Sequence, residues 1–216
     1  MDAAALIALL KHDCRLVVLQ STTSTNDEVR ERIKVDNTKP PYVVVSIQQT
    51  KGRGQQGKTW ISPQGGLYLS LQVNLPKGTP METSVHLTQI VAIAVKEALD
   101  PLSAEPLAIK RPNDILTPGG KLVGILVEGT QEGFIVGIGV NVHEPEKGGF
   151  SGASYLLSKS SDATNQRATT AAPSLEEVAA AVANSVYDCV DEWMRVNLEF
   201  SHFEARYESY LVAEIR

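Results

Sequence analysis

The sequence predicts an α+β domain with a mixed, largely antiparallel sheet and helices packed on it. Apolar β-branched segments predict strands, and many of these follow one another through short turns. Segments with apolar residues at helical spacing predict helices near both ends and in the middle. Successive hairpins favour this class over a doubly wound parallel sheet. With 216 residues, the chain is long enough for one domain, residues 1–216, with one buried core.

The first part of the chain predicts alternating helices and strands. Hydroxyl and amide side chains before a helical segment favour an N-terminal cap, and a β-branched apolar run favours a buried strand. These elements are a helix over 3–11, a strand over 15–20, a helix that is capped by Ser24 or Thr25 and runs to about Lys34, and a buried strand over 42–48.

The rest of the chain predicts a half-buried strand, a helix, a set of hairpin strands and two final helices. Alternation of apolar and polar residues marks the half-buried strand, and a TPGG turn and a Thr130–Gly133 turn join the hairpin strands. In order, these elements are a strand over 66–75, a helix over 84–99, short strands near 106–110 and 114–116, strands over 121–129 and 132–142, a mobile loop over 143–173, and helices over 174–200 and 202–210.

Composition excludes several classes of protein. The net charge is −5 and the sequence pI is about 5.4, which argues against a nucleic-acid-binding surface. No apolar run is long enough for a membrane span, and no signal peptide is apparent. Cys14 and Cys189 have no partner motif, so a reducing compartment is expected, the cytoplasm or an organelle. The four histidines lie outside any metalloprotease motif, and no serine-hydrolase elbow occurs.

One basic, glycine-rich loop stands out in this acidic chain. Residues 49–60, QTKGRGQQGKTW, contain Lys51, Arg53 and Lys58 and no acidic residue. Gly52, Gly54 and Gly57 let backbone N–H groups approach an oxyanion, and the Arg53 guanidinium can hold a phosphate or a carboxylate with two hydrogen bonds. The loop therefore predicts an anion site. A solvated loop or a nucleic-acid patch remains an alternative on this motif alone.

Three other polar groups border apolar elements. Ser24, Thr25 and Asn26, with Gln49, suit a neutral ligand rich in donors and acceptors such as a cyclic urea, although a simple helix cap would look the same. Lys121 borders an apolar strand and requires water or an anion; an ion pair with Asp114 is the alternative to a catalytic role. The remaining polar candidates are Lys110 and Asn113, Asn141, which also suits a satisfied core amide, and Trp60, which suits either a stacking platform or a core anchor.

Together these segments resemble the biotin–protein ligases, relatives of the lipoate ligases and of class II synthetase cores. The matching blocks, in family order, are STN at 24–26, QTKGRGQQGKTWISPQGGLYLS at 49–70, KRPNDIL at 110–116, KLVGILVE at 121–128 and GIGVNV at 137–142. The resemblance covers roughly residues 20–142. One glycine loop is weak evidence, whereas five ordered blocks are specific.

The resemblance implies an enzyme that forms biotinyl-AMP from biotin and ATP and transfers biotin to a lysine of a carboxylase's biotin-carrier domain. The implied partners are biotin, ATP with Mg²⁺ bound through its phosphates, and the acceptor protein, with the enzyme a monomer or homodimer. The implied biotin contacts are Ser24, Thr25, Asn26, Gln49, Gly52, Arg53, Lys121, Gly124, Gly137 and Gly139. The implied ATP contacts are Arg53, Gly54, Lys58, Trp60, Asn113 and Asn141. The implied catalytic groups are Lys121, Arg53 and Asp114, of which Asp114 would accept or orient the proton of the acceptor lysine.

The sequence departs from the family pattern at three places. Gln55 replaces the second arginine of GRGR, Arg111 replaces tryptophan in KWPND, and Lys58 replaces an arginine, which predicts weaker retention of the adenylate. The early STN block leaves no room for an N-terminal helix-turn-helix, and a C-terminal β-barrel domain is expected to be absent or truncated. The competing interpretations are a lipoate ligase or octanoyltransferase, a non-catalytic biotin or adenylate sensor, and a nucleic-acid-binding module.

Overall fold

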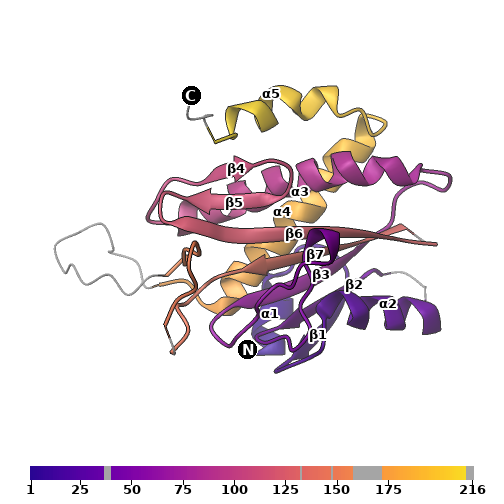
Figure 1. Ribbon diagram of the computed structural model, residues 1–216. Helices are drawn as coiled ribbons and strands as arrows, with labels where there is room; N and C mark the ends of the chain where they lie inside the picture. The colour runs from indigo at the N-terminus through magenta and orange to yellow at the C-terminus, as the bar shows by residue number, and fades with distance from the viewer. Residues whose placement is uncertain (37–39, 132, 147, 158–171, 213–216) are drawn as a thin grey trace.

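A computed structural model describes residues 1–36, 40–131, 133–146, 148–157 and 172–212, and in these residues seven strands form one sheet (Figure 1). The strand order is β1-β2-β3-β7-β6-β5-β4, in which β1 and β2 are parallel and the other neighbours are antiparallel. The strands are β1 (Arg15–Leu19), β2 (Tyr42–Ser46), β3 (Leu67–Val73), β4 (Ala108–Lys110), β5 (Asp114–Thr117), β6 (Gly120–Thr130) and β7 (Gly133–Val140). The predicted α+β class with a mixed sheet is confirmed.

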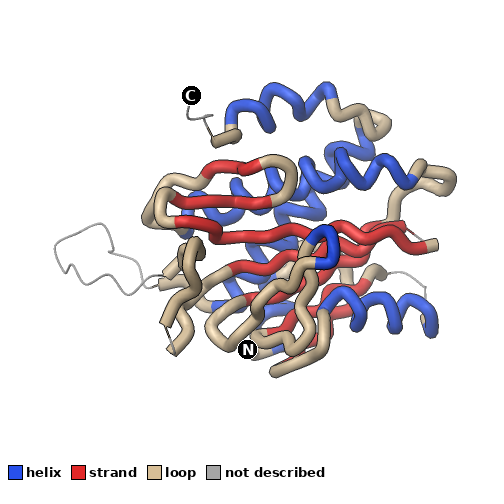
Figure 2. Tube along the Cα trace, viewed as in Figure 1, coloured by secondary structure: helices blue, strands red, loops and turns tan. Residues whose placement is uncertain are grey.

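Helices cover both faces of this sheet. Figure 2 shows most of the helical segments behind the strands, where α3 and α4 pack against each other and against the sheet. The α-helices are α1 (Ala3–Leu9), α2 (Thr25–Val35), α3 (Ser84–Leu99), α4 (Leu175–Arg195) and α5 (Ser201–Ser209). Short 3-10 turns are η1 (Gln55–Gly57), η2 (Met81–Thr83) and η3 (Asp100–Leu102).

The two faces of β3 explain why one sequence prediction was wrong. The alternation in β3 sends its leucines toward the main core with α3 and α4, and it sends Tyr68, Ser70 and Gln72 to the other face. That second face is also covered, because Val29 and Ile33 of α2 pack on β2 and β7. All seven residues of β3 are therefore buried, whereas a half-buried strand was predicted.

Helix ends differ from the predicted bounds for local reasons. The last long helix was predicted to reach residue 200, but α4 ends at Arg195 because Asn197 and Leu198 adopt left-handed φ values of 55° and 62°. Its predicted start is confirmed: the Ser174 hydroxyl accepts a hydrogen bond from the Glu177 N–H in a capping box. The first helix ends at Leu9 and not at residue 11.

The segment after β7 was predicted as a mobile loop over 143–173. Residues 147 and 158–171 of it lie outside the described residues. The part that is described is tied to the sheet: the Lys121 N–H donates to Gly152 O (2.8 Å), and the Ser154 N–H donates to Lys121 O (2.9 Å). Residues 152–154 therefore run beside the first residues of β6.

Candidate active site

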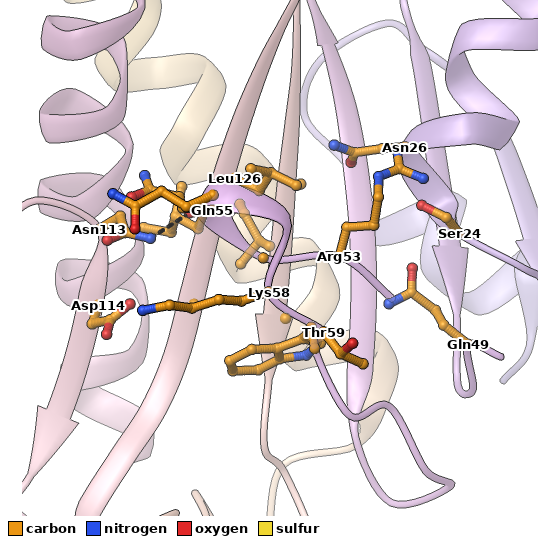
Figure 3. A pocket seen from close by; sticks show the side chains of 18 of the residues that line it. Ser24, Asn26, Gln49, Arg53, Gln55, Lys58, Thr59, Asn113, Asp114 and Leu126 are labelled. Atoms are coloured by element: carbon orange, nitrogen blue, oxygen red, sulfur yellow. Dashed lines mark hydrogen bonds between the residues drawn. The ribbon is translucent and has the colours of Figure 1, made fainter. Parts of the chain in front are cut away.

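A cavity of about 320 Å³ lies on the sheet face that carries α2. Its volume falls in the range of small-molecule sites. Figure 3 shows Ser24, Asn26 and Gln49 on one side of it and Asn113 and Asp114 on the other. The lining residues are Ser24, Thr25, Asn26, Gln49, Arg53, Gly54, Gln55, Gln56, Lys58, Thr59, Trp60, Pro112, Asn113, Asp114, Lys121, Gly124, Ile125, Leu126, Gly137, Ile138 and Gly139. These include most of the residues singled out in the sequence, but neither Gly52 nor Asn141.

Two glycines form the floor beneath Trp60. Gly124 of β6 pairs with Gly139 of β7, so two positions without side chains lie side by side. A Cβ at Gly139 would lie 2.4 Å from Trp60 Nε1, and a Cβ at Gly124 would lie 2.8 Å from Trp60 Cζ3. The indole thus packs directly on the strands, and its Nε1 has no hydrogen-bond partner among the described residues. Trp60 is both anchored on the sheet and part of the cavity wall.

The start of α2 supplies a polar wall, formed by Ser24, Thr25, Asn26 and Gln49. Ser24 is the N-cap, as predicted, but its side chain makes no capping hydrogen bond. Gln49 does this instead: its Oε1 accepts from the Thr25 N–H (2.9 Å) and from Thr25 Oγ1 (3.1 Å). Gln49 Nε2 donates to Ser62 Oγ (3.0 Å). The strand end and the helix end are thereby joined at the cavity.

Two residues that were not predicted from the sequence, Ser70 and Glu128, contact this wall from behind and do not line the cavity. Ser70, fully buried in β3, contacts Thr25 Oγ1 (2.7 Å) and Asn26 Oδ1 (2.6 Å). Glu128 of β6 accepts from Asn26 Nδ2 (2.8 Å). Ser70 is a polar residue inside an apolar strand, and Glu128 ends the KLVGILVE block, so both signals were present in the sequence.

Arg53 faces two carboxylates. It donates to both oxygens of Asp27, at 2.6 and 2.8 Å, and its Nη2 lies 3.4 Å from Glu128. The guanidinium lowers the pKa of the Asp27 carboxyl, chiefly through their hydrogen bonds, and the same bonds raise the pKa of Arg53. Arg53 is therefore held at the cavity edge as a permanent cation, with its neighbouring anions on α2 and β6.

Lys121 and Asp114 form an ion pair at the other side of the cavity. Lys121 Nζ lies 2.7 Å from Asp114 Oδ1, and it also lies 5.0 Å from the centroid of the Trp60 ring. About a third of the Lys121 side chain is exposed, so the ammonium is accessible from the cavity. The pairing that the sequence left open is thus present, and it places the ammonium beside the indole.

The two asparagine candidates are fixed by the backbone. Asn113 Nδ2 donates to Ile125 O (2.8 Å), which holds the residue at the cavity rim. Asn141 Nδ2 donates to Lys121 O (3.0 Å) and does not line the cavity. Asn141 is thus a satisfied amide that supports the backbone under Lys121.

The basic loop folds back over the cavity as a flap. Arg53 and Thr59 pair across it, and the Gly54 N–H donates to Lys58 O (2.6 Å). The tip turns through Gln56 and Gly57, with φ values of 56° and 73°, a region that glycine adopts without strain. Gln55 and Lys58 line the cavity, and Lys51 does not.

Arg111, a departure from the family pattern, points elsewhere. Its guanidinium lies 5.5 Å from the Tyr207 ring centroid and 2.5 Å from Glu208 Oε1, both on α5. It therefore joins the sheet edge to α5 and is not among the cavity residues.

The carboxylates near the cavity already have cationic partners, since Asp114 pairs with Lys121 and Asp27 with Arg53. No group of three His, Cys, Asp or Glu side chains within the described ranges is placed to ligate a metal ion. Of the helices that the structure describes, none has the length and apolarity of a bilayer span.

Comparisons with known proteins agree with this geometry. The model of the biotin/lipoate A/B protein ligase family matches residues 18–144. The bifunctional ligase/repressor BirA of Bacillus subtilis is 36% identical over 142 residues, which are 63% of this chain and 41% of that protein. The biotin–[acetyl-CoA-carboxylase] ligase of Mycobacterium tuberculosis is 34% identical over 138 residues, 62% of this chain and 52% of that protein.

A solved structure extends the likeness beyond the matched segment. Biotin protein ligase from Aquifex aeolicus in complex with biotin and ATP superposes with a TM-score of 0.69 and 27% identity, covering 92% of this chain and 78% of that one. The chain spans only about half, or less, of the length of the two curated relatives. The family model, however, matches more than half of the chain. The chain belongs to the biotin/lipoate A/B protein ligase family.

Proposed function

We propose that this chain is an ATP-dependent biotin–protein ligase, which forms biotinyl-AMP and transfers biotin to a lysine of a biotin-carrier domain. One observation carries the proposal: Arg53 and Lys121, from segments far apart in sequence, line the same cavity with the polar wall and Trp60. The named functions of the relatives and the biotin- and ATP-bound structure from Aquifex aeolicus support the same activity.

The first half-reaction joins two anions. A carboxylate oxygen of biotin attacks the α-phosphorus of ATP, and pyrophosphate leaves. Arg53 and Lys121 offset the repulsion between the reactants and stabilise the charge on the transferring group. At roughly 4 Å and an effective dielectric of about 20, each charge pair contributes about 4 kcal/mol before desolvation. Mg²⁺ would enter with the nucleotide substrate, bound through phosphate oxygens.

The ion pair between Lys121 and Asp114 would make Asp114 available only after an anionic substrate has bound. While Lys121 is paired, the Asp114 carboxylate is occupied. An anionic substrate would draw the ammonium toward itself and release Asp114. In the second half-reaction, the acceptor lysine must be neutral to attack the anhydride carbonyl, with AMP leaving. The freed Asp114 carboxylate would take or orient the proton of that amine.

Binding of the two substrates follows from the same geometry. The polar wall would hold the ureido ring of biotin through its donors and acceptors. Gly137 and Gly139 leave room on β7 for the Asn26 and Trp60 side chains that line the cavity. The Trp60 indole would pack on the adenine, and Gly54 with Lys58 would hold phosphates. The flap at 49–60 would shield the anhydride from water.

Because Cys14 and Cys189 are free thiols, a reducing compartment such as the cytoplasm suits the protein.

One assay tests the proposal. The chain is incubated with Mg-ATP and labelled biotin, with and without a biotin-carrier domain, and biotinyl-AMP and labelled carrier are quantified. We expect biotinyl-AMP in both reactions and labelled carrier only in the second. Adenylate without transfer would exclude the non-catalytic sensor and identify an adenylate former that is not a protein ligase, and activity with lipoate but not with biotin would identify the rival ligase. No adenylate from either acid would refute the proposal.

A further inference from the structure

The regular sheet gives the strand end that carries Lys121 less support than the rest of β6. The ladder between β6 and β7 begins at Val123, which pairs with Val140, so Lys121 lies beyond it. On the other side of β6, the pairing with β5 shifts register just before Leu116, the residue that lies opposite Lys121. A residue at such a position needs further contacts to be held in one place.

Residues 152–154, which follow β7 in the chain, supply these contacts. They form a parallel bridge with the strand end, in which Ala153 lies beside Lys121. The Lys121 N–H donates to Gly152 O (2.8 Å), and the Lys121 carbonyl accepts from the Ser154 N–H (2.9 Å). Both main-chain polar groups of Lys121 are therefore bound by the 152–154 segment.

Side chains and close packing reinforce this bridge. Ser154 is 9% exposed, and its Oγ donates to the carbonyl of Gly120, the residue before Lys121 (3.1 Å). The Asn141 amide donates a further hydrogen bond to Lys121 O (3.0 Å). A Cβ at Gly120 would lie 2.5 Å from Gly152 O, so the two backbones approach each other as closely as a glycine allows. A shift of the 152–154 segment would therefore move the main chain of Lys121.

The position of this main chain affects where the ammonium lies. Lys121 Nζ lies 2.7 Å from Asp114 Oδ1 and 5.0 Å from the centroid of the Trp60 ring, and two thirds of the side chain is covered. A displaced main chain leaves the side chain few staggered rotamers that keep both contacts. Misplacement of a group by about 1 Å at a reacting centre can lower a rate on the order of 100-fold.

From this we propose that the 152–154 segment, anchored by Ser154, is a positioning element for Lys121. Residues 152–154 do not line the cavity, so they act on the reaction through Lys121 and not through contact with the substrates. The inference deepens the proposed function and rests on it, because Lys121 is taken there as a cation at the reacting phosphate. The segment lies after residues 18–144, the part of the chain that the family model matches.

The first test removes the Ser154 hydroxyl. S154A should lower the rate of biotinyl-AMP formation about fivefold to tenfold at saturating biotin and Mg-ATP, with little change in KM for either substrate. Single-turnover release of pyrophosphate measures the rate. S185A is the matched control, since Ser185 Oγ also donates to a main-chain carbonyl, that of Ala94 (2.8 Å), but it joins α4 to α3 and does not line the cavity. Urea unfolding should show a similar loss of stability in both variants, whereas S185A should keep the wild-type rate.

A second pair of variants acts on the backbone. G120A places a Cβ 2.5 Å from Gly152 O, so the 152–154 segment has to move, and the rate should fall on the order of 100-fold. G119A, one residue earlier, makes contacts of 3.5 Å or more and should stay within about twofold of the wild type. Gly120 has a φ of 141°, so alanine is also strained there, and S154A supplies the measurement without that strain.

Double variants with K121A show whether the effect passes through Lys121. If the segment acts by placing the ammonium, S154A should slow K121A by less than about twofold, although it slows the wild type about fivefold or more. A general loss of structure would slow both backgrounds by the same factor. This difference between backgrounds is therefore specific to positioning.

The possible outcomes are distinct. Wild-type protein that forms no adenylate would refute the proposed function, and a normal rate in K121A would remove Lys121, and this inference with it, from the mechanism. Slow K121A together with S154A at the wild-type rate would refute the positioning role alone. Equal slowing of the wild type and of K121A by S154A would also refute it. If G120A does not fold, the S154A measurements decide.

Discussion

Lys121 Nζ lies 2.7 Å from Asp114 Oδ1 and 5.0 Å from the centroid of the Trp60 ring, so one ammonium group contacts both an anion and an aromatic face. These two partners belong to β5 and to the basic loop, and the arrangement links the strand hairpin to the flap. Four predictions follow from this contact and from its neighbours in the cavity.

Replacing Lys121 with alanine should lower the rate of biotinyl-AMP formation by at least about 100-fold, because one of the two cations at the reacting phosphate is lost. The measurement is single-turnover release of pyrophosphate with saturating biotin. K51A is the control, since Lys51 lies in the same basic loop but does not line the cavity. Adenylate formation at the wild-type rate in K121A would remove this lysine from the mechanism.

Asp114→Asn should separate the two half-reactions. Loss of the carboxylate frees Lys121 for the substrate, so adenylate formation should remain within about tenfold of the wild type. Transfer to the carrier domain should fall by about 100-fold, because the attacking amine loses its proton acceptor. Rapid-quench measurements with preformed biotinyl-AMP isolate the second step. Equal losses in both steps would show that Asp114 serves mainly to hold Lys121.

Gly139→Ala should displace Trp60, since the new Cβ would lie 2.4 Å from its Nε1. Forcing the indole from its place should cost about 1–3 kcal/mol of stability. ATP affinity should fall by about tenfold if the indole packs on adenine, since stacking on a base is worth roughly 1–3 kcal/mol. Urea unfolding and tryptophan fluorescence provide the readouts.

The control for this substitution is Gly119→Ala, on the hairpin between β5 and β6. A Cβ there would meet Thr117 Oγ1 at 3.5 Å and Ser154 Cβ at 3.7 Å, both ordinary contacts. G119A should therefore leave the fluorescence of Trp60 unchanged. An identical spectrum and identical ATP affinity for G139A would contradict the assigned packing of Trp60.

Asp27 should titrate below the ordinary aspartate value of about 3.9, because Arg53 stabilises its ionised form. A carboxyl whose folded pKa is depressed stabilises the fold fully above its unfolded pKa. That contribution disappears as the pH falls through the lower folded pKa. NMR titration of the Asp27 carboxyl tests this, and R53M should raise the value toward normal. An Asp27 pKa that R53M leaves unchanged would show that other groups cause the shift.

Local signals in the sequence predicted the helices and strands well. Contacts between residues far apart in the sequence were not predicted. The start of α2 at Thr25 and the cap at Ser174 follow from neighbouring residues, and both were predicted. The hydrogen bond from the Thr25 N–H to Gln49 was not predicted, because the two residues meet only where the end of β2 lies beside the start of α2 in the fold. The burial of Ser70 depended similarly on where α2 packs.

In the candidate site, too, motif residues were predicted and contacts between distant residues were not. Family blocks identified Arg53 and Lys121, but no spacing rule pairs Arg53 with Asp27, 26 residues away in the chain. The role of Asn141 was left open between a core amide and a nucleotide contact, and the structure places its amide on the Lys121 carbonyl. Residues that line the cavity were predicted from the family blocks, whereas the residues that support them are recognised by their contacts.

Gly124 and Gly139 leave an empty patch in the surface of the sheet, and a side chain from the flap fills it. Trp60 consequently belongs to the folded interior and to the wall of the cavity at once. Its anchoring confines large movements of the flap to the turn at Gln55–Gly57, since withdrawing the indole would uncover bare backbone. Any change in the shape of the cavity wall at Trp60 would therefore have to begin with the sheet beneath the flap.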